Sequence, residues 1–289
     1  MPELPEVETV RRGLEALIVG KKVASATSDN PKSFPNAPQD VASFLVGATI
    51  QDIHRRAKLL LVSLSSGYSL LVHLKMTGQL VYVDSGVRFG AGHPNDSLVH
   101  ELPDHSTRVA ISFDDGSTLY FNDQRKFGWV RLMPTIEVPN IDFMKKVGPE
   151  PLEADFTAAQ FAQRFARRTR TNIKAALLDQ SVVAGIGNIY ADEALWGAHI
   201  HPQRLVASLS EDDFERIYID VRAVMNLSIE KGGSSNKNYV NAEGKKGSYM
   251  DFARVFRREG LACPRCGATI EKLRVAGRGT HICPVCQTI

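Results

Sequence analysis

The chain has 289 residues, of which 43% are hydrophobic and 23% are charged, and its formal net charge is +3. This length predicts two domains, and this composition is typical of a soluble globular protein. Because no run of roughly 18 residues is apolar and the first residues are acidic, we expect no transmembrane helix, no secretory signal and a cytoplasmic protein.

Basic residues are concentrated in three segments. Residues 164–174 hold five basic residues and no acid, residues 231–247 hold four lysines and one glutamate, and residues 250–289 hold seven basic and three acidic residues. Local patches of this kind on a nearly neutral chain indicate a polyanionic partner. For any single patch the alternative is ordinary solubilising surface charge.

The first predicted element is a helix over residues 5–19, where apolar residues recur at steps of three and four. Pro5 suits the first turn, because its missing N–H would be unpaired there in any case. Glu6 and Glu8 complement the positive end of the helix dipole, and Gly20 ends the helix.

Strands are expected from about residue 21 to residue 135, where short apolar or alternating runs predict an antiparallel sandwich or barrel. Residues 108–123 predict a hairpin that turns at Asp115 and Gly116. Residues 84–107 are rich in glycine, histidine, proline, aspartate and serine, and they predict a loop.

Helices are expected in the second half of the chain, after prolines that interrupt residues 133–153. Thr157 and Gln160 form a capping box at the start of the first one. Further helices are expected at 173–180, 188–198 and 210–232. Gly185 and Gly187 precede the helix at 188–198, so its N-terminus could bind a phosphate, although a tight turn between helices is the alternative.

The cysteines form two C-x2-C pairs separated by sixteen residues, namely Cys263, Cys266, Cys283 and Cys286. Two such pairs suit one tetrahedral ion, so we interpret them as a structural zinc site. The alternatives are disulfides, which a cytoplasmic location disfavours, and a rubredoxin-like iron site. The segment between the pairs predicts a β-hairpin with Gly277, Arg278 and Gly279 at its tip, where an arginine suits phosphate contact.

The first residues contain a candidate nucleophile. If Met1 is removed, Pro2 becomes a free secondary amine. An α-amino group has a pKa near 8 and lysine one near 10.4, so at neutral pH the terminal amine is about a hundredfold richer in its neutral form. Attack on a carbonyl-level carbon gives an iminium, which is an electron sink, and Glu3 is placed to transfer protons beside it. If Met1 stays, the proline nitrogen is an amide and this chemistry is impossible.

Several motifs, taken in order, resemble the bacterial formamidopyrimidine-DNA glycosylases, which remove oxidised purines such as 8-oxoguanine. They are MPELPEVETVRRGL at the start, RRAKLLL at 55–61, HLKMTGQL at 73–80, DQRKFG at 123–128, VGPEPL at 147–152, GIGNIYADEAL at 185–195, and GRGTH between the cysteine pairs.

The resemblance implies an α+β multidomain fold with one structural zinc. Residues 1–135 form a leading helix with an antiparallel β-sandwich, and residues 136–152 form a linker. A helix–two-turn–helix domain over 153–250 and a zinc ribbon over 251–289 complete the chain.

The resemblance also implies a bifunctional glycosylase and abasic-site lyase. In this family the N-terminal proline attacks C1′ of the damaged nucleotide and expels the base, which assigns the nucleophile to Pro2, and Glu3 assists proton transfer. Lys58 is assigned to phosphate contact and β-elimination, and Arg278 to phosphate contact and δ-elimination. For Lys58 the alternative is an ordinary surface lysine at the end of a strand.

The damaged nucleotide must leave the helix before C1′ can be reached, and side chains fill the gap it leaves. The resemblance gives this task to Met76 as a wedge, Phe127 as a stacking ring and Arg125 as a partner of the orphaned cytosine. Without the surrounding motif, Met76 and Phe127 would more often be core residues.

Other residues carry over as contacts. The positions matching DNA contacts are His73, His105, Arg170 and Asn188. Those assigned to the damaged-base pocket are Glu6, Ser234, Ser235 and Tyr239, the last three in a loop at 232–249 that closes over the flipped base.

Two alternatives stay open. One is endonuclease VIII, a relative of the same fold that acts on oxidised pyrimidines. The other is a DNA-binding protein without catalysis, held to DNA by the ribbon and the helical turn. The PELPEV start and the set of Met76, Arg125 and Phe127 favour the purine enzyme. We expect damaged double-stranded DNA as the partner of a monomeric chain.

Overall fold

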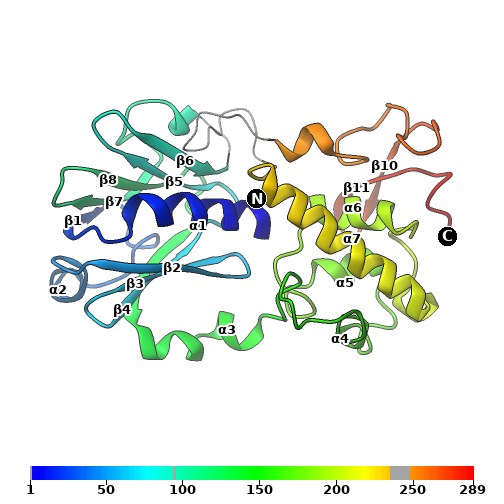
Figure 1. The fold of residues 1–289 in the computed structure, drawn as a ribbon, viewed down its shortest axis with the longest axis horizontal. Helices are drawn as coiled ribbons and strands as arrows, with labels where there is room; N and C mark the ends of the chain where they lie inside the picture. Colours follow the sequence, from blue (N-terminus) through cyan, green and yellow to red (C-terminus); the bar gives the residue numbers. More distant parts are fainter. Residues whose placement is uncertain (1, 94–95, 235–247) are drawn as a thin grey trace. The chain divides into compact units, whose positions relative to one another are not determined.

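The computed structural model describes residues 2–93, 96–234 and 248–289. The chain divides into two compact units, and Figure 1 labels most of their helices and strands. The first unit comprises Met1–Lys145 with Lys231–Ser248, and the second comprises Lys146–Glu230 with Tyr249–Ile289. The expected helical and ribbon segments thus fall mainly in one unit, and the division into four parts stays a prediction.

Helix α1 (Leu4–Ile18) opens the first unit and confirms the predicted N-terminal helix, shifted by one residue at each end. Pro5 lies in its first turn and Glu3 is its N-cap. Val10, Leu14 and Ile18 are fully buried on one face. Each such side chain contributes about 2 kcal/mol of transfer free energy, which fixes the helix against the strands.

Two antiparallel sheets make up the rest of the first unit, as the sequence predicts. The five-stranded sheet has the order β1 (Val23–Ser28), β7 (Thr107–Phe113), β8 (Thr118–Asp123), β5 (Gly78–Val83), β6 (Arg88–Gly92). The four-stranded sheet has the order β2 (Ile50–Arg56), β3 (Leu59–Leu64), β4 (Tyr68–His73), β9 (Trp129–Pro134). Helix α1 packs along edge strands β2 and β6, one from each sheet (Figure 1).

The core of the first unit lies between these sheets and α1. Leu60 and Val72 come from one sheet, Leu80 and Phe121 from the other, and Leu14 from the helix. Short helical segments connect the strands, at α2 (Pro38–Asp40), Val41–Leu45, Asp96–Leu98, Thr135–Asn140 and α3 (Asp142–Lys146). Among them, Val41–Leu45 contributes Val41 and Leu45 to the core.

The hairpin predicted over 108–123 is confirmed as β7 and β8, with Asp115 and Gly116 in its turn. Gly116 has φ +89°, a left-handed conformation that favours glycine. The loop predicted over 84–107 is partly wrong, because residues 88–92 form β6 and pair with β5. That strand reads RFGAG, and its glycines hide the alternation that marks a strand.

The second unit is helical with a terminal hairpin. Its helices are α4 (Ala158–Arg164), α5 (Ile173–Leu178), α6 (Asn188–Gly197) and α7 (Glu211–Glu230), with one-turn segments at Val206–Ser208 and Tyr249–Phe252. The capping box of Thr157 and Gln160 is confirmed at the start of α4. Among the described residues, none of the helices has the length and apolarity needed to span a bilayer.

The terminal hairpin consists of β10 (Glu271–Val275) and β11 (Arg278–Ile282). Its predicted tip is off by one residue: Val275 pairs with Arg278, so the turn is Ala276 and Gly277, both with positive φ. Arg278 therefore opens β11, where the strand ladder fixes its backbone.

Candidate functional site

The buried amino end of α1 brings three predicted residues together. Pro2 is buried just before the helix, and Glu3 is only 3% exposed. The Glu6 carboxylate accepts the Glu3 N–H through Oε2 at 2.8 Å and the Ser234 N–H through Oε1 at 2.8 Å. Glu6 thus connects Glu3, which follows the predicted nucleophile Pro2, to Ser234 at the start of the loop predicted over 232–249. Ser235 and Tyr239 lie outside the described residues.

Lys58 lies at the turn between β2 and β3, and this turn is fastened to α1. Arg55 binds Glu8 at 3.0 Å through Nε and donates from Nη1 to the Ala57 carbonyl at 3.0 Å. Burial would raise the pKa of Glu8, but hydrogen bonds from Arg11 and Arg12 and the charges of Arg11 and Arg55 outweigh it and leave that pKa lowered. Lys58 itself is 6% exposed, which does not fit the alternative of an ordinary surface lysine.

His73 ends β4 and is 8% exposed. Burial, together with the charges of Lys75 and Lys58, lowers its pKa to about 3, so the ring is neutral at neutral pH. Its Nδ1 accepts the Lys75 N–H at 3.1 Å. The hydrogen of the neutral ring is therefore on Nε2, which makes His73 an N–H donor suited to a phosphate oxygen.

The predicted gap-filling residues occupy two loops of the first unit. Phe127 is 54% exposed, so the alternative of a core residue is wrong for it, and Met76 is half-buried in the loop before β5. The Arg125 guanidinium carbon lies 4.8 Å from the centre of the Phe127 ring. This cation–π contact pairs the two side chains on one loop.

His105 is exposed on a turn that precedes β7. Asp104 closes this turn by accepting the Ser106 N–H at 2.7 Å, and Arg108 Nη2 donates to the His105 carbonyl at 2.5 Å. The backbone of His105 is thus fixed while its ring faces solvent.

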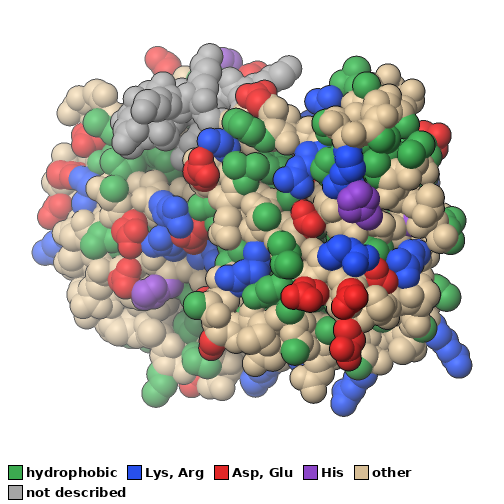
Figure 2. All heavy atoms as spheres, turned by 45° about the vertical axis from the view of Figure 1, so that its right-hand side comes forward, with side chains coloured by type: hydrophobic (Ala, Val, Ile, Leu, Met, Phe, Trp, Pro, Cys, Tyr) green, Lys and Arg blue, Asp and Glu red, His purple; other side chains and the backbone are tan. Residues whose placement is uncertain are grey.

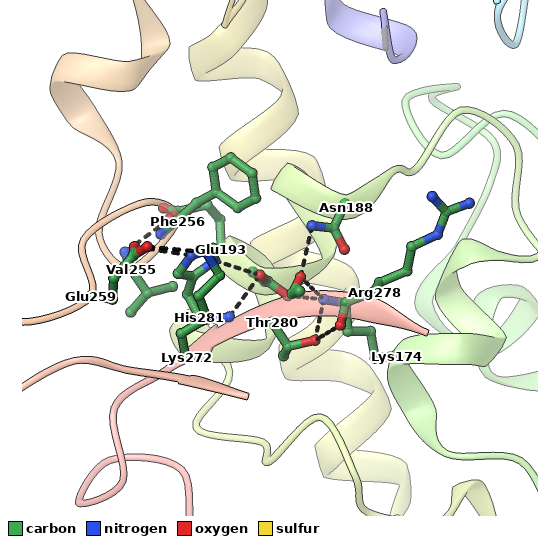
Figure 3. Close-up of polar contacts among 12 residues, drawn as sticks. Lys174, Asn188, Glu193, Val255, Phe256, Glu259, Lys272, Arg278, Thr280 and His281 are labelled. Atoms are coloured by element: carbon green, nitrogen blue, oxygen red, sulfur yellow. Dashed lines mark hydrogen bonds and ion pairs between the residues drawn. The ribbon is translucent and has the colours of Figure 1, made fainter. Parts of the chain in front are cut away.

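In the second unit, Asn188 contacts the hairpin beside Arg278. Asn188 begins α6, and its Nδ2 donates to the Gly279 carbonyl at 2.9 Å. Arg278 is exposed, and Figure 3 shows its side chain extending away from the hydrogen bonds around Thr280. Arg170 is exposed in the turn before α5.

A buried charge network, which the sequence did not predict, holds this hairpin on α5 and α6. Lys174 and Asp192 are both fully buried, with Nζ and Oδ1 2.6 Å apart. Lys174 also donates to Thr280 Oγ1 at 2.6 Å, and Asp192 Oδ2 accepts the His281 N–H at 2.9 Å (Figure 3). The strand that carries Arg278 is therefore fixed by charge-assisted hydrogen bonds.

A second buried acid fixes the segment that leads into the hairpin. Glu193 of α6 is fully buried and accepts the N–H groups of Arg254, Val255 and Phe256 at 2.8–2.9 Å. The Tyr249 hydroxyl adds a fourth hydrogen bond at 3.1 Å. Acids of this kind are recognisable only once their partners are placed, because nothing in the local sequence marks them as buried.

The four cysteines gather at one point, with all Sγ atoms within 4.8 Å of one another. The Cys263 and Cys286 sulfurs are 4.0 Å apart and those of Cys266 and Cys283 are 3.4 Å apart. These separations exceed the disulfide length of about 2.05 Å. They bracket the edge of about 3.8 Å expected for four sulfurs around one zinc ion at about 2.3 Å.

The surroundings of these thiols shift their pKa values in opposite directions. Burial and hydrogen bonds with the neighbouring cysteine sulfurs raise the pKa of Cys286 to about 12. Burial opposes ionisation of Cys263 too, but the backbone N–H groups of Cys266 and Arg265 outweigh it and lower its pKa to about 6. A divalent cation supplies the positive charge that four adjacent thiolates require.

Basic side chains on the face in Figure 2 occur in several groups over its right half, interspersed with acidic and apolar ones. On this face the basic side chains thus form local groups and not one continuous patch.

Comparisons with known proteins agree along the whole chain. Residues 1–130 match the formamidopyrimidine-DNA glycosylase N-terminal domain, residues 147–239 match the H2TH domain of the same enzymes, and residues 260–289 match the zinc finger found in FPG and IleRS. The chain belongs to the formamidopyrimidine-DNA glycosylase family. The predicted fold class is confirmed, and the cysteine cluster is its structural zinc site.

Individual relatives of the family cover nearly the full length. The formamidopyrimidine-DNA glycosylase of Streptococcus mutans is 41% identical over 287 residues, with 99% of each chain covered. That of Herpetosiphon aurantiacus is 43% identical over 289 residues, covering 99% of this chain and 100% of the relative. A solved structure of Lactococcus lactis Fpg with abasic-site DNA is 36% identical, with a TM-score of 0.87 over 99% of this chain and 100% of that one.

Proposed function

We propose that the chain is a DNA glycosylase and abasic-site lyase of base excision repair, which removes oxidised purines from duplex DNA. Its full-length relatives are named formamidopyrimidine-DNA glycosylases, and similar solved structures contain abasic-site DNA or Fapy-dG DNA. The observation that carries the proposal is the buried start of α1, where Pro2 precedes Glu3 and Glu6 fixes the backbone between them. We further propose that it works as a monomer in the cytoplasm, on nucleoid DNA.

The reaction begins at Pro2 after removal of Met1. The lone pair of the proline nitrogen attacks C1′ of the flipped nucleotide, and the bond from C1′ to the base breaks. The nitrogen then loses its proton, the C1′–O4′ bond breaks as O4′ takes up a proton, and the opened sugar is held as an iminium. The positive nitrogen acidifies the C2′ hydrogens and permits β-elimination of the 3′-phosphate. Glu3, buried one residue away, moves the protons that these steps require.

We assign the binding of DNA phosphates to side-chain hydrogen-bond donors whose backbone is held in place by the fold. Lys58 and the neutral His73 serve in the first unit, and Asn188 and Arg278 serve in the second. Further phosphate contacts are assigned to Arg170, His105 and the basic segments of the chain. These contacts make the DNA affinity fall as the salt concentration rises. Zinc held by the four cysteine sulfurs would have no open position for water or substrate, so it would organise the hairpin that carries Arg278 and take no part in the chemistry.

Glu6 and Ser234 are proposed to line the damaged-base pocket, with Ser235 and Tyr239 on the same loop. Met76, Arg125 and Phe127 are proposed to fill the gap in the duplex. The exposure of Phe127 supports this role, because a large apolar ring in water is otherwise unfavourable.

Borohydride trapping tests the proposal. Protein whose mass confirms a free Pro2 terminus is mixed with 8-oxoguanine duplex or thymine-glycol duplex, and the iminium is reduced to a stable crosslink. We expect the crosslink to form faster with 8-oxoguanine. A preference for thymine glycol would favour an endonuclease VIII activity, and binding without any crosslink would favour the non-catalytic DNA-binding protein.

A further inference from the structure

The two loops proposed to enter DNA are joined by hydrogen bonds at their bases. Strand β5 begins at Gly78, directly after the loop with Met76, and β8 ends at Asp123, directly before the loop with Arg125 and Phe127. Gly78 and Asp123 are paired across the two strands. The loops therefore leave the sheet at the same point.

Asp123 fastens both loops with one carboxylate. It is fully buried, and its Oδ2 accepts the Gly128 N–H at 2.6 Å, which closes the loop from 124 to 128. Its Oδ1 accepts the Thr77 hydroxyl and the Arg125 N–H, the latter at 3.2 Å. Thr77 Oγ1 also lies 3.2 Å from the Arg125 nitrogen, so this N–H is shared between the two loops.

The backbone of Asp123 is held just as firmly. Arg108 is 4% exposed and donates from Nε to the Asp123 carbonyl at 3.0 Å, while its Nη1 binds Asp29 at 2.7 Å. The Asp123 N–H donates to the Ser106 carbonyl at 2.8 Å. A Cβ at Gly128 would lie 2.7 Å from the Phe121 ring, so the loop approaches the sheet here more closely than any residue but glycine allows without a shift.

We propose that Asp123 and Thr77 are positioning residues that lock the two loops into one rigid unit. Met76, Arg125 and Phe127 then enter the duplex together, and the Arg125 side chain is presented at a fixed place to the orphaned base. Hydrogen bonds to a buried carboxylate are strong and directional, which suits such a lock. The inference rests on the proposed function, because it assumes that these loops contact DNA.

The lock is tested with Thr77→Val, which keeps the shape of the side chain and removes its hydroxyl. Thr77→Ser restores the hydroxyl, and Thr118→Val is a matched control in β8, where the threonine contacts Ser112 at 3.2 Å. Three activities are compared: excision of 8-oxoguanine opposite C, excision opposite A, and lyase activity on a single-stranded abasic oligonucleotide. The last substrate has no opposite strand for the loops to enter.

We expect Thr77→Val to slow duplex excision about tenfold, as the loss of one charge-assisted hydrogen bond implies. The preference for C over A should also fall, while single-stranded lyase activity, Thr77→Ser and Thr118→Val match the wild type. If Thr77→Val does not fold, Asp123→Asn replaces it in the test, and we expect the same pattern of activities from that variant.

Unchanged duplex excision and opposite-base preference in Thr77→Val would overturn the lock, and so would an equal loss of all three activities. A wild-type protein that excises nothing would instead refute the proposed function. In that case, hydrogen exchange of the Arg125 and Gly128 amides tests the lock without any need for activity. The lock predicts slow exchange of both amides in the wild type and faster exchange in Thr77→Val. Equal exchange rates in the two proteins would refute it.

Discussion

His73 makes the folding stability of the first unit depend on pH in a way that can be calculated. Its pKa is about 3 in the folded protein, because burial and the charges of Lys75 and Lys58 disfavour the protonated ring. An unfolded histidine has a pKa of about 6.5. As the pH falls below about 6.5 the unfolded state gains a proton that the folded state excludes, so stability falls until about pH 3, where both states are protonated.

The size of the effect follows from these values. At pH 5.0 the unfolded histidine is about 1.5 pH units below its pKa and the folded one is still neutral, so His73 costs about 2 kcal/mol relative to neutral pH. Replacing His73 with Gln removes the titration, so the variant should lose about 2 kcal/mol less stability than the wild type between pH 7 and pH 5.

Urea unfolding at the two pH values measures this difference. A Trp196→Phe background leaves Trp129, 5.8 Å from the His73 ring, as the reporter of the first unit. His100→Gln is the control, because His100 is an exposed histidine of the same unit. Equal pH dependence in His73→Gln and the wild type would refute the neutral, buried ring and with it the assignment of His73 as an Nε2–H donor.

Three further predictions concern the second unit. Lys174→Met leaves the fully buried Asp192 without its lysine. It should lower the free energy of unfolding of this unit, measured in urea, by about 3–5 kcal/mol. A decrease below about 1 kcal/mol would contradict the buried ion pair. Cys283→Ser should bind no zinc, which native mass spectrometry would show, and should bind abasic DNA more weakly than the wild type. Normal binding would show that the hairpin makes no contribution to DNA binding. Arg278→Ala should reduce the slope of log K against log salt by about 1, and an unchanged slope would remove Arg278 from the phosphate contacts.

The sequence predicted the elements whose signals are local. The apolar spacing of α1, the capping box at Thr157 and the turn at Asp115 and Gly116 each depend on residues a few positions apart. Strand β6 was missed because its glycines remove the apolar alternation. The hairpin tip was displaced because Ala276 takes a left-handed conformation, with φ +49°, which is uncommon for an alanine and has no local sequence signal.

The candidate site divides in the same way. The cysteines were predictable from their spacing, and chemistry alone suggested Pro2 and Glu3, whose roles stay a prediction. The buried acids Asp123, Asp192 and Glu193 were not, although each stands inside a motif that the sequence made conspicuous. Asp192, for example, binds Lys174 and His281, which are 18 and 89 positions away along the chain. Such partners become visible only when the fold brings them together.

The central claim is that the nitrogen of Pro2 bonds to the sugar, and peptide mapping of the reduced crosslink tests it most directly. After borohydride trapping with 8-oxoguanine duplex and proteolysis, mass spectrometry should find the DNA remnant on a peptide that begins with Pro2. A remnant on Lys58, or excision by protein that retains Met1, would contradict the account.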